Sequence, residues 1–275
     1  MYLQRQERHH HAANRKKEKY ESHLAMLARR SRYHEPMSMP AHGGGGVAFF
    51  GGSFDPPHQG HLAVARAAQI ALALDSVLFA PVGVQPLKPS GSTAAFADRL
   101  AMTELAIHGQ PNYSISLIDA PAVGRTHYYT IDTLLLLRAK MSPGTSLYCL
   151  MGADSFRNLR SWHRGADVPF AAPLIVVARP GQPLEDLAAD LPPGLSLDRD
   201  CGETRTNGGV ELRSFTIRSE DGALAPFFLL PGIHIDISAS EIRRHLHDTV
   251  DDQLRAQNLL PASVREYIAT HNLYR

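Results

Sequence analysis

The sequence predicts an α/β fold: a doubly wound parallel sheet in a single domain, residues 46–275, after a disordered basic extension, residues 1–45. Three observations support this fold class. From Val47 onward, short apolar runs alternate with longer Ala- and Leu-rich runs that have helical periodicity. This order is typical of βαβ units, in which the strands are parallel and the crossovers are right-handed. The 275 residues are 44% hydrophobic and 20% charged, an ordinary globular composition.

The first part of the domain follows this alternation regularly. Apolar runs such as VAFF and LIVV are of strand length, whereas runs such as HLAVARAAQIALAL repeat apolar residues three and four apart, as on one helix face. We expect, in order, strand 47–50, helix 61–74, strand 76–82, helix 96–107, strand 113–118, helix 129–141, strand 146–151, helix 154–162 and strand 173–179.

The pattern weakens after Arg179. A short helix is expected within PGQPLEDLAADLPPG, residues 192–209 look like a loop, and the runs 210–218 and 227–230 read as weak strands. Two helices are then predicted, at 238–246 and 261–271. The stretch 186–226 is hydrophilic and long, and the sequence suggests no role for it.

The extension differs in charge from the rest of the chain. Residues 1–42 contain nine Lys/Arg and four Asp/Glu, a balance of +5, and four glycines follow them. The remainder contains 19 basic and 23 acidic residues, a balance of −4. A basic arm that binds nucleic acid or a membrane surface is one interpretation, but a charge run alone favours a tail with no such role.

Composition excludes several other classes. A net acidic domain argues against nucleic acid as a partner. No apolar run reaches the ~18 residues of a membrane span. The two cysteines, Cys149 and Cys201, are too few for a disulfide framework and suit a reducing cytoplasm. No pattern predicts an oligomeric state.

The stretch GGSFDPPHQGHL (51–62) connects the first strand to the first helix, where an open parallel sheet binds ligands. Glycines at 51 and 52 let phosphate oxygens approach the main chain and tolerate positive φ. Ser53 adds a hydroxyl, and two prolines stiffen the loop. His58 and His61, three apart at the helix start, can face one anion, while Asp55 is expected to brace the loop. The alternative is a stiff loop with one capping and one solvent-facing histidine.

The whole string resembles the H-x-G-H motif of the adenylyl- and cytidylyltransferase superfamily. ISASEIR (237–243) resembles that superfamily's late I-S-[SA]-[ST]-x-I-R element. MGADSFRNLRSWHR (151–164) resembles one branch, the bacterial nicotinate-nucleotide adenylyltransferases, and this resemblance extends through LIVVARPGQPLE, the YT of YYTIDTL and YIATHNLYR, over residues 47–275.

The resemblance implies a Rossmann-like nucleotidyltransferase fold and a reaction. ATP and nicotinate mononucleotide give nicotinate adenine dinucleotide and pyrophosphate, with Mg²⁺ held mainly by ATP phosphates and water and no metal ligand from the protein. His61 and His58 would face the α- and β-phosphates, with His61 the transition-state donor. The other implied phosphate-binding residues are Gly51, Gly52 and Ser53 for the reacting phosphate, Ser238, Ser240 and Arg243 for the β/γ-phosphates, and Lys88.

Five further residues are assigned by the same resemblance. Asp154 would accept hydrogen bonds from the adenosine ribose, although a carboxylate there can also act as a helix N-cap. Trp162 would stack on the pyridine ring near Tyr129 and Thr130, although a large aromatic residue is more often core. Main-chain N–H groups around Trp162 and His163 would bind the nicotinate carboxylate.

The sequence departs from the family at two of its usual residues. Leu87 stands where the loop after the second strand usually has a histidine, and His163 stands where an aromatic residue often follows the tryptophan. Another acceptor on the same fold, nicotinamide mononucleotide or phosphopantetheine, is an alternative, against which Trp162, the YT pair and the C-terminal LYR argue. So is a non-catalytic nucleotide-binding protein. A dinucleotide-binding oxidoreductase is disfavoured, because no G-x-G-x-x-G follows the first strand.

Overall fold

The computed structural model describes residues 45–84, 91–122, 128–178, 184–233, 238–246 and 258–274. All of them lie within one compact unit, residues 43–275. The predicted extension up to residue 44, and the loop residues Leu87 and Lys88, lie outside the described residues.

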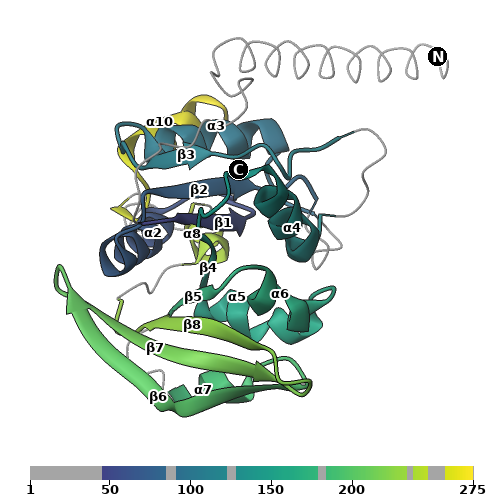
Figure 1. Cartoon of the computed structure of the whole chain (residues 1–275). Coiled ribbons are helices and arrows are strands. Elements are labelled where there is room, and N and C mark those ends of the chain that lie inside the picture. The colour runs from purple at the N-terminus through teal and green to yellow at the C-terminus, as the bar shows by residue number, and fades with distance from the viewer. Residues whose placement is uncertain are drawn as a thin grey trace. The chain divides into compact units, whose positions relative to one another are not determined.

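One sheet organises the unit, with strand order β3-β2-β1-β4-β5-β8-β7-β6 (Figure 1). The first six strands in this order, from β3 to β8, are parallel to one another. β7 pairs antiparallel with both β8 and β6. The strands are β1 (Val47–Gly52), β2 (Ser76–Pro81), β3 (Tyr113–Ile115), β4 (Leu147–Gly152), β5 (Leu174–Val177), β6 (Leu195–Asn207), β7 (Val210–Ser219) and β8 (Leu224–Leu230). The predicted α/β fold with a central parallel sheet is confirmed.

The helices connect these strands in the expected order. They are α2 (Gln59–Leu72), α3 (Phe96–Ile107), α4 (Thr130–Lys140), α5 (Ala153–Arg157), α6 (Val168–Ala171), α7 (Leu184–Ala189), α8 (Ala239–His245) and α10 (Ala262–Thr270), with short 3₁₀ turns η2 (Leu159–Ser161) and η3 (Gly165–Asp167). The connections run outward from β1 in both directions, so right-handed crossovers place α2 and α3 on one face and α4 and α6 on the other. Accordingly α4 packs on α6, and α3 on α10.

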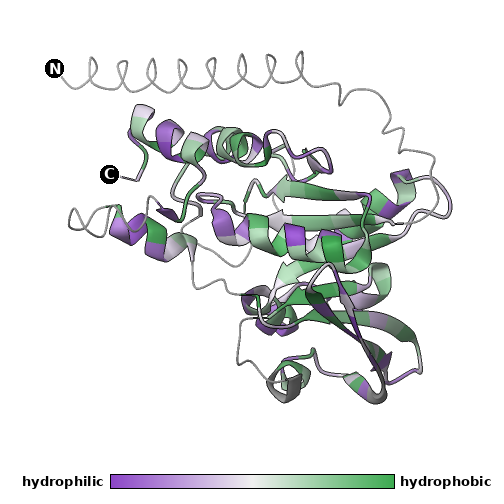
Figure 2. Ribbon diagram, turned by 90° about the vertical axis from the view of Figure 1, so that its left-hand side faces the viewer, coloured by the Kyte–Doolittle hydropathy of each residue, from purple (hydrophilic) through white to green (hydrophobic). Residues whose placement is uncertain are grey.

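The central strands form because their residues are apolar on both faces. Every residue of β5 and the first five of β4 except Tyr148 are buried, which matches a parallel sheet covered by helices on both sides. Figure 2 shows these hydrophobic strands at the centre of the ribbon. None of the helices in the described ranges is both long enough and apolar enough to span a membrane.

The loop expected at 192–209 is wrong, because residues 195–207 form β6. This strand pairs with β7 over most of its length, with an irregularity between Asp198 and Glu203. Residues 203–207 are exposed, so the strand is held by main-chain hydrogen bonds at the sheet edge and shows no apolar alternation. At its tip, Asn207 Nδ2 donates to Ile70 O in α2 (2.7 Å).

The fold contains one point where ligand binding is expected. β1 pairs with β2 on one side and with β4 on the other, and the helices that follow β1 and β4 lie on opposite faces. Crevices at this switch point, outside the carboxyl ends of the strands, are where open α/β sheets bind ligands. The loop GGSFDPPHQGHL begins there.

Candidate active site

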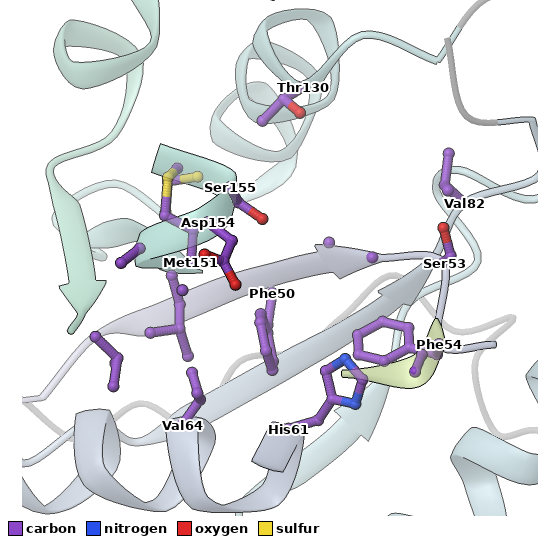
Figure 3. A pocket seen from close by; sticks show the side chains of 18 of the residues that line it. Phe50, Ser53, Phe54, His61, Val64, Val82, Thr130, Met151, Asp154 and Ser155 are labelled. Carbon is purple, nitrogen blue, oxygen red and sulfur yellow. The ribbon is translucent and has the colours of Figure 1, made fainter. Parts of the chain in front are cut away.

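A cavity of about 670 Å³ opens at the carboxyl ends of β1 and β4. It is lined by residues of both strands, the β1–α2 loop, the starts of α2, α4 and α5, and the η2–η3 turn, together with Ser238 and Arg243 from α8. Figure 3 shows His61 on the α2 side and Asp154 on the α5 side of this space. Segments spread over about 190 residues of sequence, from Phe49 to Arg243, thus meet at the point where the fold predicts ligand binding.

The two histidines of the loop lie against each other at the start of α2. Their ring centroids are 3.8 Å apart. The main-chain N–H of His58 donates to Nδ1 of His61 (3.2 Å). Because Nδ1 accepts, the ring proton of the neutral His61 side chain must be on Nε2, which makes Nε2–H a donor for a ligand.

Burial keeps both imidazoles uncharged near neutral pH. It lowers the pKa of His58 from 6.5 to about 4, and it lowers the pKa of His61 well below 6.5, with a smaller contribution from His58. His58 is 5% exposed, and its Nδ1 finds no hydrogen-bond partner in the part of the chain that the structure describes. A buried polar atom in a cavity wall without a partner is suited to a ligand. The alternative of one capping and one solvent-facing histidine is correct in its first part, because the two residues form a capping box at the start of α2, but neither residue is exposed.

Aromatic rings enclose His61 and fix the loop. Phe54 lies 5.0 Å from the His61 ring and 5.6 Å from Phe50. The positive φ expected at the glycines falls instead on Phe54 (φ 48°). A Cβ at Gly51 would lie 2.8 Å from the Phe49 ring, and one at Gly52 would lie 3.2 Å from the Phe54 ring. The glycines therefore make room for these rings as well as lining the cavity.

A buried arginine in α3, which the motif reading missed, holds the two loops beside the cavity. Arg99 is 1% exposed and donates to Ser53 O (2.5 Å), Val82 O (2.8 Å), Gly83 O (3.3 Å) and Ala94 O (3.3 Å). The C=O and N–H groups of a trans peptide point in opposite directions. Because the Ser53 carbonyl points toward Arg99, the N–H of Phe54 points away from Arg99. The helical spacing could have indicated its burial, since Arg99 falls three residues after Phe96, on the same buried face of α3.

Asp55 braces the loop, as predicted. Its carboxylate, 2% exposed, accepts hydrogen bonds from Thr93 N (2.6 Å), Ala94 N (3.0 Å) and Tyr274 Oη (2.7 Å). Its carbonyl accepts from Arg243 Nη1 (2.6 Å). The brace joins the β1–α2 loop to the start of α3 and to α8, which places Arg243 at the cavity.

The predicted phosphate residues of α8 form hydrogen bonds within that helix and its N-cap. Ser238 is the N-cap and forms a capping box with Glu241, in which each accepts from the other's main-chain N–H. Ser240 Oγ accepts from Arg243 Nη2 (3.2 Å). Ser238 and Arg243 line the cavity, whereas Ser240 is exposed outside its lining and supports the guanidinium.

Asp154 lies in the first turn of α5 and lines the cavity. Its interpretation as the N-cap is wrong, because Gly152 occupies that position. Its carboxylate lies 3.4 Å from Arg157 Nη1, and both side chains are about half exposed.

Four residues form the far wall, on the side of the cavity away from His58 and His61. Tyr129 and Thr130 stand at the start of α4, and the Tyr129 ring stacks on His163 with centroids 4.2 Å apart. Trp162 is half-buried and lines the cavity, so it is not simply core. Gly165 closes the turn that carries these rings, since a Cβ there would lie 2.0 Å from Leu159 O.

The carboxylates at the cavity do not form a metal cluster. Asp119, which the sequence reading also missed, is buried and accepts from Thr133 Oγ1 (2.6 Å), and Asp55 is committed to its brace. Within the described ranges, no three or more His, Cys, Asp or Glu side chains are grouped to hold a metal ion. This donor set fits a cation that a ligand's own oxygens hold.

Comparison with known proteins agrees with this arrangement. Residues 49–245 match the model of the cytidylyltransferase-like family. A protein of Solibacter usitatus named "probable nicotinate-nucleotide adenylyltransferase" is 35% identical over 231 residues, 83% of this chain and 98% of the relative. One of the same name from Laribacter hongkongensis is 36% identical over 229 residues, 83% of this chain and 94% of the relative.

Solved structures share the fold. Plasmodium falciparum nicotinic acid mononucleotide adenylyltransferase complexed with NaAD superposes with a TM-score of 0.58 and 19% identity, covering 84% of this chain and 97% of that one. The same enzyme complexed with APC gives a TM-score of 0.56 and 18% identity over 83% of this chain and 96% of that one.

Proposed function

The chain belongs to the cytidylyltransferase-like family and, within it, to the nicotinate-nucleotide adenylyltransferases, and we propose that its cavity transfers AMP from ATP to nicotinate mononucleotide. The products are nicotinate adenine dinucleotide and pyrophosphate, and the reaction belongs to NAD biosynthesis. The chain is thus an enzyme, a nucleotidyltransferase. The observation that carries the proposal is the pair of neutral imidazoles at the carboxyl end of β1. One has its proton fixed on Nε2, and the other has a buried Nδ1 for which the described residues provide no hydrogen-bond partner.

The reaction needs no protein nucleophile. A phosphate oxygen of the mononucleotide attacks the α-phosphorus of ATP, a new P–O bond forms, and the bond to the bridging oxygen breaks as pyrophosphate leaves. Negative charge grows on the nonbridging and leaving oxygens, so positioned donors supply most of the catalysis. We assign His61 Nε2–H to the α-phosphate in the transition state and His58 to the α/β-phosphates.

The neighbouring groups have supporting roles in this proposal. Main-chain N–H groups of Gly51, Gly52 and Ser53 bind the reacting phosphate, and Arg243 with Ser238 binds the β/γ-phosphates. Arg243 already lies at the cavity, which supports its assignment. Ser240 acts on phosphate through the Arg243 guanidinium in the arrangement described. The assignment of Lys88 to phosphate rests on the sequence alone.

Asp154 and the far wall bind the two other parts of the substrates, the adenosine ribose and the pyridine ring. Asp154 accepts from the adenosine ribose. Trp162 stacks on the pyridine ring, with Tyr129, Thr130 and His163 around it, and the half-buried position of Trp162 in the cavity wall supports this role. Mg²⁺ enters with ATP, held mainly by phosphate oxygens and water, and neutralises charge on the leaving pyrophosphate. The two cysteines, of which Cys149 is buried and free, favour the cytoplasm as the compartment.

Pyrophosphate release with ATP and Mg²⁺ tests the function directly. Nicotinate mononucleotide should be the best acceptor among nicotinate mononucleotide, nicotinamide mononucleotide and phosphopantetheine. A preference for the amide would refute the choice of acceptor. No release with any of the three would refute the enzyme assignment and favour a non-catalytic nucleotide-binding protein.

A further inference from the structure

The segment around α10, residues 258–274 (the α10 segment), holds the β1–α2 loop on both sides of His58. On one side, Gln59 N donates to Leu259 O (2.9 Å). On the other side, Tyr274 Oη donates to Asp55 Oδ1 (2.7 Å), across 219 positions of sequence. The loop that presents the imidazoles is therefore fixed from outside the cavity.

The hydrogen bond from Tyr274 is one of three that the Asp55 carboxylate receives, and all three are buried or partly buried. A buried carboxylate depends on such donors, since water does not solvate it. Burial, and next the nearby Asp55 carboxylate, raise the pKa of Tyr274 above its ordinary value. The phenol therefore keeps its proton and acts as the donor.

Tyr274 is itself held in place by packing. It is 6% exposed and belongs to an apolar cluster with Met102 of α3, Ile242 of α8 and Val264 of α10. Its φ of 58° lies in the left-handed region, which is unfavourable for a bulky residue and persists where surrounding contacts impose it. The residue thus lies in a cluster to which α3, α8 and α10 all contribute.

Resting on the adenylyltransferase function proposed above, we propose that Tyr274 is a positioning residue for phosphate transfer. It fixes the Asp55 carboxylate, and through that carboxylate the main chain that carries His58. The same main chain offers the Asp55 carbonyl to Arg243. Tyr274 does not line the cavity, so it acts through these groups and touches no substrate.

The test is Tyr274→Phe, which keeps the ring and its packing and removes only the hydroxyl. Tyr267→Phe is the matched control, because Tyr267 Oη also donates from the α10 segment to a carboxylate (Asp98 Oδ1, 3.1 Å), but that carboxylate lies in α3, away from the loop. Loss of one donor to a buried charged group should lower kcat about tenfold in Tyr274→Phe. Its KM for nicotinate mononucleotide should stay within about twofold, because the far wall is on other elements.

The readouts separate positioning from folding. Pyrophosphate release gives kcat and KM, the fluorescence of Trp162, the single tryptophan, gives mononucleotide binding, and circular dichroism gives Tm. Tyr267→Phe should match the wild type in kcat. In an Asp55→Ala background, Tyr274→Phe should cost no further activity, since the hydroxyl then has no side-chain acceptor to hold.

Two kinetic results would overturn the proposal in an active wild type: kcat of Tyr274→Phe equal to that of Tyr267→Phe, or losses from Tyr274→Phe and Asp55→Ala that simply multiply. An inactive wild type would instead refute the adenylyltransferase function on which the proposal rests. Unchanged kcat with a lowered Tm would also overturn it, because the hydroxyl would then serve only the fold.

Discussion

The burial of His58 should make the folded protein less stable as the pH falls. In the folded state burial lowers its pKa to about 4, whereas in the unfolded chain the ordinary value of 6.5 applies. Between these values the unfolded state binds more protons than the folded state, so the free energy of unfolding decreases as the pH decreases. The loss begins near pH 6.5 and is complete below about pH 4.

The size of this effect follows from the two pKa values. One pKa unit corresponds to about 1.4 kcal/mol, so the whole difference is worth about 3 kcal/mol. Integrated over the accessible range, about 2 kcal/mol of it is lost between pH 7 and pH 5. Burial of His61 acts in the same direction.

Urea unfolding of the full chain, followed by Trp162 fluorescence, measures the effect at pH 7 and pH 5. From pH 7 to pH 5, the free energy of unfolding of the wild type should fall by about 2 kcal/mol more than that of His58→Gln, because the variant lacks the buried imidazole. His108→Gln removes an exposed histidine after α3 and controls for the change of residue type. Equal pH dependence in His58→Gln and the wild type would show that His58 is not a buried neutral imidazole, and the reasoning would fail.

Three further predictions concern the site and the extension. His61→Ala should lower kcat about a hundredfold or more, with a much smaller change in ATP affinity by calorimetry; equal losses would make His61 only a binding residue. Trp162→Ala should raise KM for nicotinate mononucleotide about tenfold and leave KM for ATP nearly unchanged, and a Trp162→Ala enzyme with equal effects on both would argue against stacking. Deletion of residues 1–42 should leave kcat unchanged, and an inactive truncation would give the extension a role.

Much of the parallel sheet was predictable because its strands are buried on both faces. VAFF and LIVV can only be interior, and the helices between them carry the matching periodicity, so α3 was predicted with the bounds that the structure shows. β6 was missed because an edge strand with exposed polar residues depends on main-chain pairing, which the side-chain pattern does not encode.

The candidate site was predictable where a motif lies on one strand–loop–helix unit, as with His58 and His61. The tautomer of His61 was not, because it depends on the direction of one main-chain N–H. The brace between Asp55 and Tyr274 was also out of reach, since no local pattern relates two residues 219 positions apart. They are brought together by tertiary packing, which includes the packing of α10 on α3.

The acceptors described for the Arg99 guanidinium are all main-chain carbonyls. A carbonyl is present whatever the residue, so the side chains of Ser53 and Val82 can be exchanged without removing these anchors, whereas a Cβ at Gly83 would lie 3.0 Å from Pro121. The loops at the cavity mouth thus combine main-chain anchors, which do not depend on residue type, with side chains that can be replaced. An engineer who wishes to change this part of the cavity mouth should exchange the Ser53 and Val82 side chains and leave Arg99 untouched.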